Sequence, residues 1–118
     1  MNEEHLSPDG LYKIVVGFNE MRMSHWVQTP SLYHVQTNKI LFDAPSLWSA
    51  DSVKWSPDSD FVHMNMRLYP GSKPGIELRL YPASNEAKVQ VEQYADPTKL
   101  GEAITGSFSE ILKFLNRY

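Results

Sequence analysis

Four histidines are the residues of this chain best suited to metal binding or proton transfer. They are His5, His25, His34 and His63, on four separate segments and without short HxH or HxxxH spacing. A metal site would need them to converge in space together with carboxylates. We therefore predict no metal site and interpret each histidine as a strand or loop residue that makes an ordinary hydrogen bond.

Nucleophile and phosphate-binding motifs are absent from the sequence. No serine lies in a GxSxG setting, glycine forms no phosphate-binding loop, and cysteine does not occur. Without cysteine the chain has neither a disulfide framework nor a thiolate zinc site. We therefore expect no cofactor and interpret the chain as non-enzymatic. A small enzyme with a pocket of His and carboxylate groups is kept as an alternative.

Three carboxylates lie in or beside turns, namely Asp9, Asp58 and Asp60. A pair of catalytic carboxyl groups would need close approach within a pocket. In a Ser-Pro-Asp turn, the Asp side chain more simply accepts hydrogen bonds from the nearby backbone. We interpret these residues as turn formers.

Polar residues alternate with apolar residues in two neighbouring segments, 62–69 and 76–81, as in strands with one buried face. The polar sides carry seven candidate binding residues: His63, Asn65, Arg67, Tyr69, Glu77, Arg79 and Tyr81. Tyr and Arg are enriched at protein interfaces, so this face is a candidate binding surface. Trp26 and Trp48, in loop-like segments, are further candidates if exposed. A solvated face of alternating charges is the alternative interpretation.

An internal repeat positions these segments. Ser7-Pro8-Asp9-Gly10 recurs as Ser56-Pro57-Asp58-Ser59, about 49 positions later, and β-prone segments follow each copy. The first copy precedes segments 11–18, 32–37 and 39–43, and the second precedes 61–69, 76–81 and 88–94. A short strand is expected at 52–55, and tight reversals at 37–39 and 84–86. Segment 19–31 fits either a longer strand or a bent connection.

The C-terminal segment changes to helical periodicity. Apolar residues recur at helical spacing from Phe108 to Leu115, and Ser107 with Glu110 matches a capping box. We predict a helix over 107–116. The chain is therefore expected to be one α+β, mostly β domain over 1–118, with six to seven antiparallel strands in two Ser-Pro-Asp-initiated triplets (7–55 and 56–96) covered by one C-terminal helix. Residues 1–6 are expected to be flexible, and Asp96-Pro97 to end the strands.

The stretch Trp55-Ser56-Pro57-Asp58-Ser59 resembles the WSPDG-type repeat of β-propellers, such as the Tol translocation propeller and the prolyl oligopeptidase propeller. The first copy matches less fully, because Leu6 replaces the Trp. The resemblance implies that each Ser-Pro-Asp turn joins two strands of one blade. A propeller has at least about four blades of about 40 residues, whereas this chain has room for two. We expect a compact two-sheet domain, with a ring of two-blade chains as the alternative.

Charge and composition narrow the function. The net charge is −3, and the 11 Lys and Arg residues are scattered, so no nucleic-acid partner is expected. No membrane-spanning apolar run and no signal peptide are found, which predicts a cytoplasmic protein. We predict a protein-binding module of the inhibitor or immunity type, and the mild acidity suits a basic protein partner. A self-assembling structural domain that forms a homo-oligomer is the second hypothesis.

Overall fold

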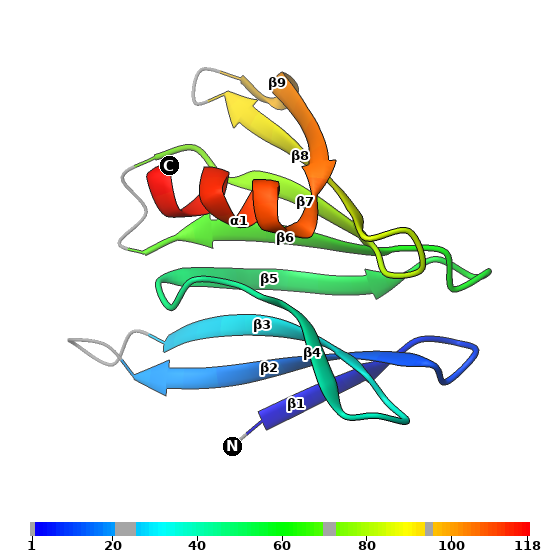
Figure 1. The fold of residues 1–118 in the computed structure, drawn as a ribbon. Helices are drawn as coiled ribbons and strands as arrows, with labels where there is room; N and C mark the ends of the chain where they lie inside the picture. The colour runs from blue at the N-terminus through cyan, green and yellow to red at the C-terminus, as the bar shows by residue number, and fades with distance from the viewer. Residues whose placement is uncertain (1, 21–25, 70–72, 94–95) are drawn as a thin grey trace.

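The chain folds into two antiparallel sheets and one helix. In the computed structural model, which describes residues 2–20, 26–69, 73–93 and 96–118, strands follow one another across each sheet in chain order (Figure 1). Sheet 1 contains β1 (Asn2–Leu6), β2 (Tyr12–Glu20), β3 (Trp26–His34) and β4 (Lys39–Asp43). Sheet 2 contains β5 (Trp48–Trp55), β6 (Val62–Leu68), β7 (Ile76–Tyr81), β8 (Glu86–Gln93) and β9 (Asp96–Ser107), and α1 (Phe108–Arg117) follows. The predicted fold class is confirmed.

The nine strands of the described chain exceed the six to seven predicted. One addition is β1, in the segment that was expected to be flexible. It pairs antiparallel with β2 from Asn2 opposite Gly17 to Leu6 opposite Lys13. The first Ser-Pro-Asp turn reverses the chain, so the segment before the turn meets the segment after it. Each predicted triplet is therefore a four-stranded unit, β1 to β4 and β5 to β8.

The second addition is β9, which corrects the prediction that Asp96-Pro97 ends the strands. β9 begins at Asp96 and pairs with β8 as far as Ser107, with two irregularities in register. Its sequence contains Pro97 and two Gly and shows no apolar alternation. The open edge of β8 supplies the pairing that the sequence pattern does not indicate.

Two strand boundaries also differ from expectation. The undecided segment 19–31 enters β3 at Trp26, and its residues 21–25 lie outside the described chain. β5 begins at Trp48, four residues before the predicted start at Ser52. Trp48 pairs with Leu68 at the end of β6. β5 therefore extends four residues to the N-terminal side of the predicted strand.

Each Ser-Pro-Asp turn is closed by the same side-chain hydrogen bonds. Ser7 Oγ donates to Asp9 Oδ1 at 2.6 Å and accepts from the Tyr12 amide at 3.1 Å, while Asp9 Oδ1 also accepts from the Leu11 amide at 3.0 Å. The second turn repeats these contacts at 2.7, 3.1 and 3.0 Å through Ser56, Asp58, Phe61 and Asp60. The serine hydroxyl, and then the backbone amide, lower the pKa of each turn aspartate below its ordinary value. The interpretation of these aspartates as turn formers is confirmed.

The last residue of each turn adopts a left-handed backbone, with φ of 75° at Gly10 and 63° at Ser59. Ser59 Oγ accepts a hydrogen bond of 2.9 Å from the Asp9 amide, which links the two turns directly. Gly10 has no hydroxyl, so the link runs in one direction only. The predicted reversals before β4 and β8 are also present, with Asn38 and Asn85 both at φ 56°.

The C-terminal helix begins as its sequence predicts. Ser107 is the N-cap, its hydroxyl accepts from the Glu110 amide at 3.3 Å, and Glu110 Oε1 accepts from the Ser107 amide at 3.1 Å. The hydrogen bonds to Ser107 lower the pKa of Glu110. Its apolar residues Phe108, Ile111 and Leu115 are buried. The predicted capping box is therefore confirmed, with the first helical residue one position later than expected.

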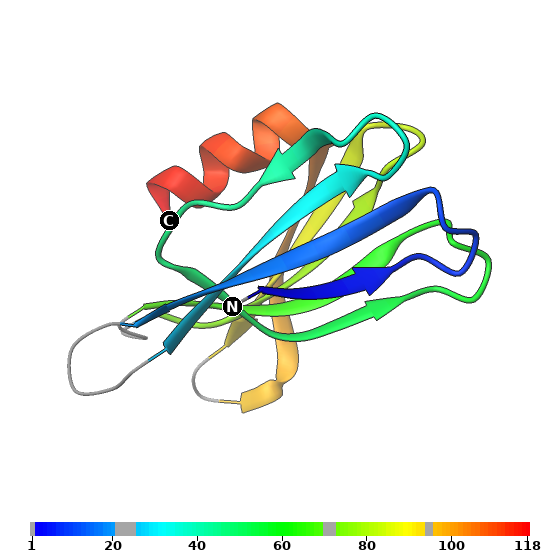
Figure 2. The same cartoon turned by 90° about the horizontal axis from the view of Figure 1, so that it is seen from below.

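One cluster of buried side chains lies between the sheets and the helix. It contains Ile14, Val16, Leu32, Phe42, Ala44, Trp48, Ala50, Val62, Met64, Met66, Ile76, Leu78, Leu80, Ala87, Val89, Phe108, Ile111 and Leu115. The helix packs against β8 and β9 and reaches β4 through an edge-to-face contact of Phe108 with Phe42. Figure 2 shows α1 and β4 on the same side of the molecule, away from β1. Sheet 1 and α1 together cover the inner face of sheet 2.

The two sheets meet through faces that are not equivalent. When the two units are aligned at their turns and followed across the paired strands, the cross-strand row His5, Ile14, Leu32 and Phe42 of sheet 1 corresponds to Lys54, His63, Arg79 and Lys88 of sheet 2. In sheet 1, Ile14, Leu32 and Phe42 of this row are buried in the core, whereas the row in sheet 2 faces outward. Sheet 2 instead packs the next row against the core, with Val62, Leu80 and Ala87 buried and Trp55 partly buried. The counterparts of this row in sheet 1 are Leu6, Lys13, Tyr33 and Ile40. The two sheets are therefore stacked front to back.

Candidate functional site

The outer face of sheet 2 carries most of the predicted binding residues. Six of the nine lie on the outward side of β6 and β7: His63, Asn65, Arg67, Glu77, Arg79 and Tyr81. Their neighbours along each strand, such as Met64 and Leu78, are fully buried. The alternation seen in the sequence therefore separates core from surface, as expected.

A row of basic side chains crosses this face at one level. Lys54 on β5 pairs with His63, His63 with Arg79, and Arg79 with Lys88 on β8. We name these four residues the basic row. Three of them, Lys54, Arg79 and Lys88, are exposed, and none of these three forms an ion pair with a described carboxylate. Like charges directly opposite one another destabilise a sheet, so Arg79 and Lys88 repel each other here.

Acidic and polar residues line the row on one side. His63 Nε2 lies 3.1 Å from Glu77 Oε1, and Asn65 Nδ2 donates to Ser52 Oγ at 2.9 Å. Arg67 forms a bidentate ion pair with Asp51, in which Nε donates to Oδ2 at 2.7 Å and Nη2 donates to Oδ1 at 2.9 Å. This ion pair raises the pKa of Arg67. These contacts engage Glu77 with His63 and Asp51 with Arg67. Glu86 lies two residues before Lys88 on the outward side of β8, but it forms no ion pair with Arg79 or Lys88 in the described chain.

Aromatic rings border the row on the other side. The Arg79 guanidinium lies over the Phe61 ring, 4.9 Å from its centroid, and Phe61 packs against Tyr81 with ring centroids 5.4 Å apart. A cation over an aromatic face is held by the ring quadrupole. Arg79 therefore has a fixed position without losing its positive charge.

The remaining predicted residues lie elsewhere. Tyr69 follows the end of β6, and its amide donates to the Leu47 carbonyl at 2.8 Å. Trp26 is 55% exposed, but it begins β3 in sheet 1. Trp48 is fully buried, and its Nε1 donates to the Leu115 carbonyl at 3.2 Å. Trp48 is therefore corrected from a candidate binding residue to a core residue, because α1 covers it.

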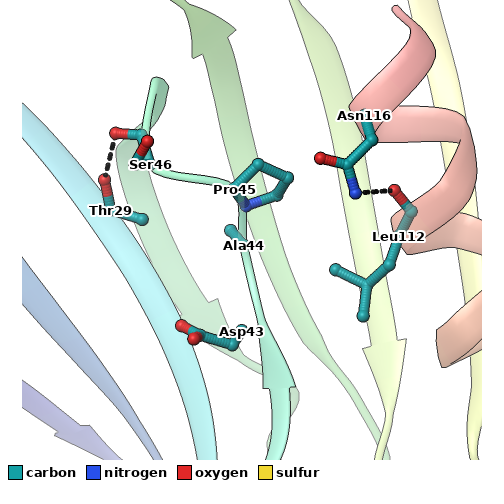
Figure 3. Close-up of a pocket in the computed structure, with 7 residues that line it drawn as sticks. All are labelled: Thr29, Asp43, Ala44, Pro45, Ser46, Leu112 and Asn116. Atoms are coloured by element: carbon teal, nitrogen blue, oxygen red, sulfur yellow. Dashed lines mark hydrogen bonds between the residues drawn. The ribbon is translucent and has the colours of Figure 1, made fainter.

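Two open pockets lie beside α1, and neither contains a histidine. The larger, about 440 Å³, lies between the β4 to β5 connection and the helix (Figure 3) and is lined by Thr29, Asp43, Ala44, Pro45, Ser46, Leu112 and Asn116. Its polar side chains are engaged in local hydrogen bonds. Thr29 Oγ1 donates to the Ser46 carbonyl, and Asn116 Nδ2 to the Leu112 carbonyl. The smaller, about 330 Å³, is lined by Lys73, Pro74, Phe114, Arg117 and Tyr118. Neither pocket offers a pair of acid and base groups.

Within the described ranges, no three His, Asp or Glu side chains gather closely enough to hold a metal ion. His25 lies outside those ranges. The helix that the structure describes is too short to cross a bilayer.

No family model, curated protein or solved structure matches this chain. The clearest likeness is internal, between the two four-stranded units. Lys54, Phe61 and Lys88, which complete the outer face of sheet 2, were missed from the sequence. Aligning the two copies by their Ser-Pro-Asp turns and following β5 and β8 would have found them, because Glu86, Lys88 and Gln90 alternate with Ala87 and Val89.

Proposed function

We propose that the chain is a non-enzymatic protein-binding module of the inhibitor or immunity type, which binds an acidic segment of its partner across the outer face of sheet 2. The observation that carries this proposal is the basic row, in which Arg79 stands directly opposite Lys88 with no described carboxylate between them. Carboxylates of a partner placed over the row would relieve this repulsion. They would also form charge-assisted hydrogen bonds with these two side chains.

The dimensions of the row suit a short acidic segment. Neighbouring strands lie about 4.8 Å apart, so the row spans about 14 Å from β5 to β8. That length matches about two or three carboxylates on one side of an extended peptide. Phe61 and Tyr81, beside Arg79, supply apolar contact of the kind that concentrates binding energy at interfaces.

Local charge matters more than net charge for this surface. The net charge of −3 favours a basic partner, and no observation tests that prediction. A partner that approaches sheet 2, however, meets the field of the nearest groups, because more distant charges are screened beyond about 8 Å at physiological salt. We therefore propose an acidic partner.

The test is a titration of the isotope-labelled chain with an Asp- and Glu-rich peptide, followed by NMR. We expect amide shifts confined to β5 to β8. The variant Arg79→Gln/Lys88→Gln should weaken binding about tenfold or more, about 1.4 kcal/mol. The matched control Lys39→Gln/Lys113→Gln removes the same charge outside this face and should leave binding unchanged. Equal binding by both variants, or no binding of the peptide, would contradict the proposal. Tighter binding of a single-stranded oligonucleotide at the row would also contradict it.

A further inference from the structure

The basic row contains one member whose charge depends on pH. His63 lies between Lys54 of β5 and Arg79 of β7, and it pairs with both across the sheet. Imidazole is the side chain that ordinarily changes charge between about pH 5 and 8, whereas lysine and arginine stay positive throughout that range. The number of positive charges in the basic row therefore rises from three to four as the pH falls.

The contact between His63 and Glu77 determines where the added proton binds. His63 Nε2 lies 3.1 Å from Glu77 Oε1. An ionised carboxylate only accepts hydrogen bonds, so Nε2 carries the hydrogen of the neutral ring and Nδ1 takes up the second proton. The side chains of His63 and Glu77 are 24% and 31% exposed, so solvent reaches both. Protonation therefore converts the existing hydrogen bond into an ion pair without breaking it.

The charged groups around His63 act in opposite directions. Lys54 and Arg79 stand directly opposite His63 and disfavour a further positive charge, whereas Glu77 favours it. Farther along β6, the charge of Arg67 is compensated by its ion pair with Asp51. These are the charged side chains that β5, β6 and β7 present around His63 on the outer face. A partner carboxylate placed over the row would shift this balance toward the protonated imidazole.

We propose that His63 makes the binding of the acidic segment pH-dependent, so that the outer face of sheet 2 binds its partner more tightly when the imidazole is protonated. The inference rests on the proposed function, because it concerns the same surface and the same partner. No lysine or arginine of the described chain forms an ion pair with Glu77. While His63 is neutral, the Glu77 carboxylate therefore repels an acidic partner, and protonation of His63 compensates that charge.

Thermodynamic linkage sets the direction of the effect, and Coulomb's law sets its size. A partner that binds the protonated form better holds the proton more tightly in the complex, so affinity rises as the pH falls. A unit charge about 5 Å from a carboxylate in a water-like dielectric changes an equilibrium constant about three- to fivefold. At about 20 mM salt we expect binding about threefold tighter at about pH 5.5 than at about pH 7.5, and at about 500 mM salt less than about twofold.

The test is an NMR titration of the full chain with the Asp- and Glu-rich peptide at about pH 5.5 and 7.5, a range in which the peptide carboxylates stay largely ionised. His63→Gln keeps a neutral side chain that can donate to Glu77, and it should bind at both pH values as the parent does at the higher one. The matched control His34→Gln, which removes a histidine of sheet 1 that contacts Thr37, should retain the pH dependence of the parent. Circular dichroism at both pH values verifies that each variant is folded.

A second readout uses the unmodified chain, so the inference stays testable if a variant unfolds. By reciprocity, saturation with the peptide should move the protonation of the His63 ring, followed by its nitrogen resonances, to higher pH by about half a unit. Equal or weaker binding at the lower pH, or a pH dependence that persists in His63→Gln, would overturn the inference and leave the proposed function standing. Absence of peptide binding at both pH values would overturn both proposals.

Discussion

The two four-stranded units of this chain share a topology and differ in which face they bury. Both place a Ser-Pro-Asp turn between their first two strands and an asparagine with positive φ before their last strand. Ile14 in sheet 1 is fully buried, whereas its counterpart His63 in sheet 2 lies on the surface beside Glu77. Local turn chemistry is thus the same in both units, and the choice of the buried face depends on the side chains of each strand.

This difference explains how one repeated unit yields two unlike surfaces. Front-to-back packing buries Ile14, Leu32 and Phe42 of sheet 1 and leaves the corresponding row of sheet 2 on the surface, where polar residues are tolerated. A repeat packed through equivalent faces would have placed similar residues in both rows. The different outer faces of the two sheets are therefore consequences of the same packing.

The largest expected effect comes from exchanging residues between the corresponding positions. Ile14→His should destabilise the fold by about 3 kcal/mol or more, because it buries a polar ring and removes core packing. His63→Ile, at the half-buried counterpart on the outer face, should change stability by no more than about 1 kcal/mol, because it removes only the surface contact with Glu77. Urea unfolding followed by Trp fluorescence measures both. Similar losses in the two variants would mean that the two positions do not differ in burial.

The two Ser-Pro-Asp turns, unlike the outer faces of the two sheets, should respond equally to the same substitution. Ser7→Ala and Ser56→Ala should each cost about 1 to 2 kcal/mol, because each leaves the Tyr12 or Phe61 amide without its side-chain acceptor. Thermal unfolding monitored by circular dichroism provides the comparison. The control Ser84→Ala, in an exposed turn, should stay within about 0.5 kcal/mol of the parent. A large effect at only one turn would show that the two turns are not equivalent.

The smallest expected effect is a gain in stability at the basic row. Lys88→Glu should stabilise the fold by about 0.5 kcal/mol at low salt, because it replaces the repulsion with Arg79 by attraction. Lys88→Gln should give about half of this gain. Both gains should vanish near 1 M salt, where screening acts within about 3 Å. Unfolding free energies at two salt concentrations test this, and a loss of stability in both variants would mean that the row is not under repulsion.

Features with local signals could be predicted from the sequence. The capping box at Ser107 and Glu110, the two Ser-Pro-Asp turns and the alternation in β6 and β7 depend on residues a few positions apart. In each case, the residues that interact lie close together in the sequence. The helix, the turns and six of the binding candidates were placed correctly for this reason.

Features that depend on distant partners could not be predicted. β1 and β9 exist because β2 and β8 offer open edges, and their own sequences lack a strand pattern. Trp48 stands in a segment of loop-like composition, and its contacts with α1, including the hydrogen bond to the Leu115 carbonyl 67 positions away, make it a core residue. The basic row crosses four strands, so the sequence alone does not show that Lys54 lies beside His63 or that Lys88 lies beside Arg79. These neighbours follow only from the register of the strands.

The order of strands in each sheet has a consequence for the kinetics of folding. Every strand pairs only with its neighbours along the chain, so each sheet can form by successive hairpins that close short loops. Contacts of low sequence separation are associated with fast folding. The contacts that join the two sheets, from Asp9 to Ser59 and from Trp55 to His5, then form when preassembled sheets dock. The rate-limiting step is therefore expected to be the meeting of the two sheets, after their strands have paired.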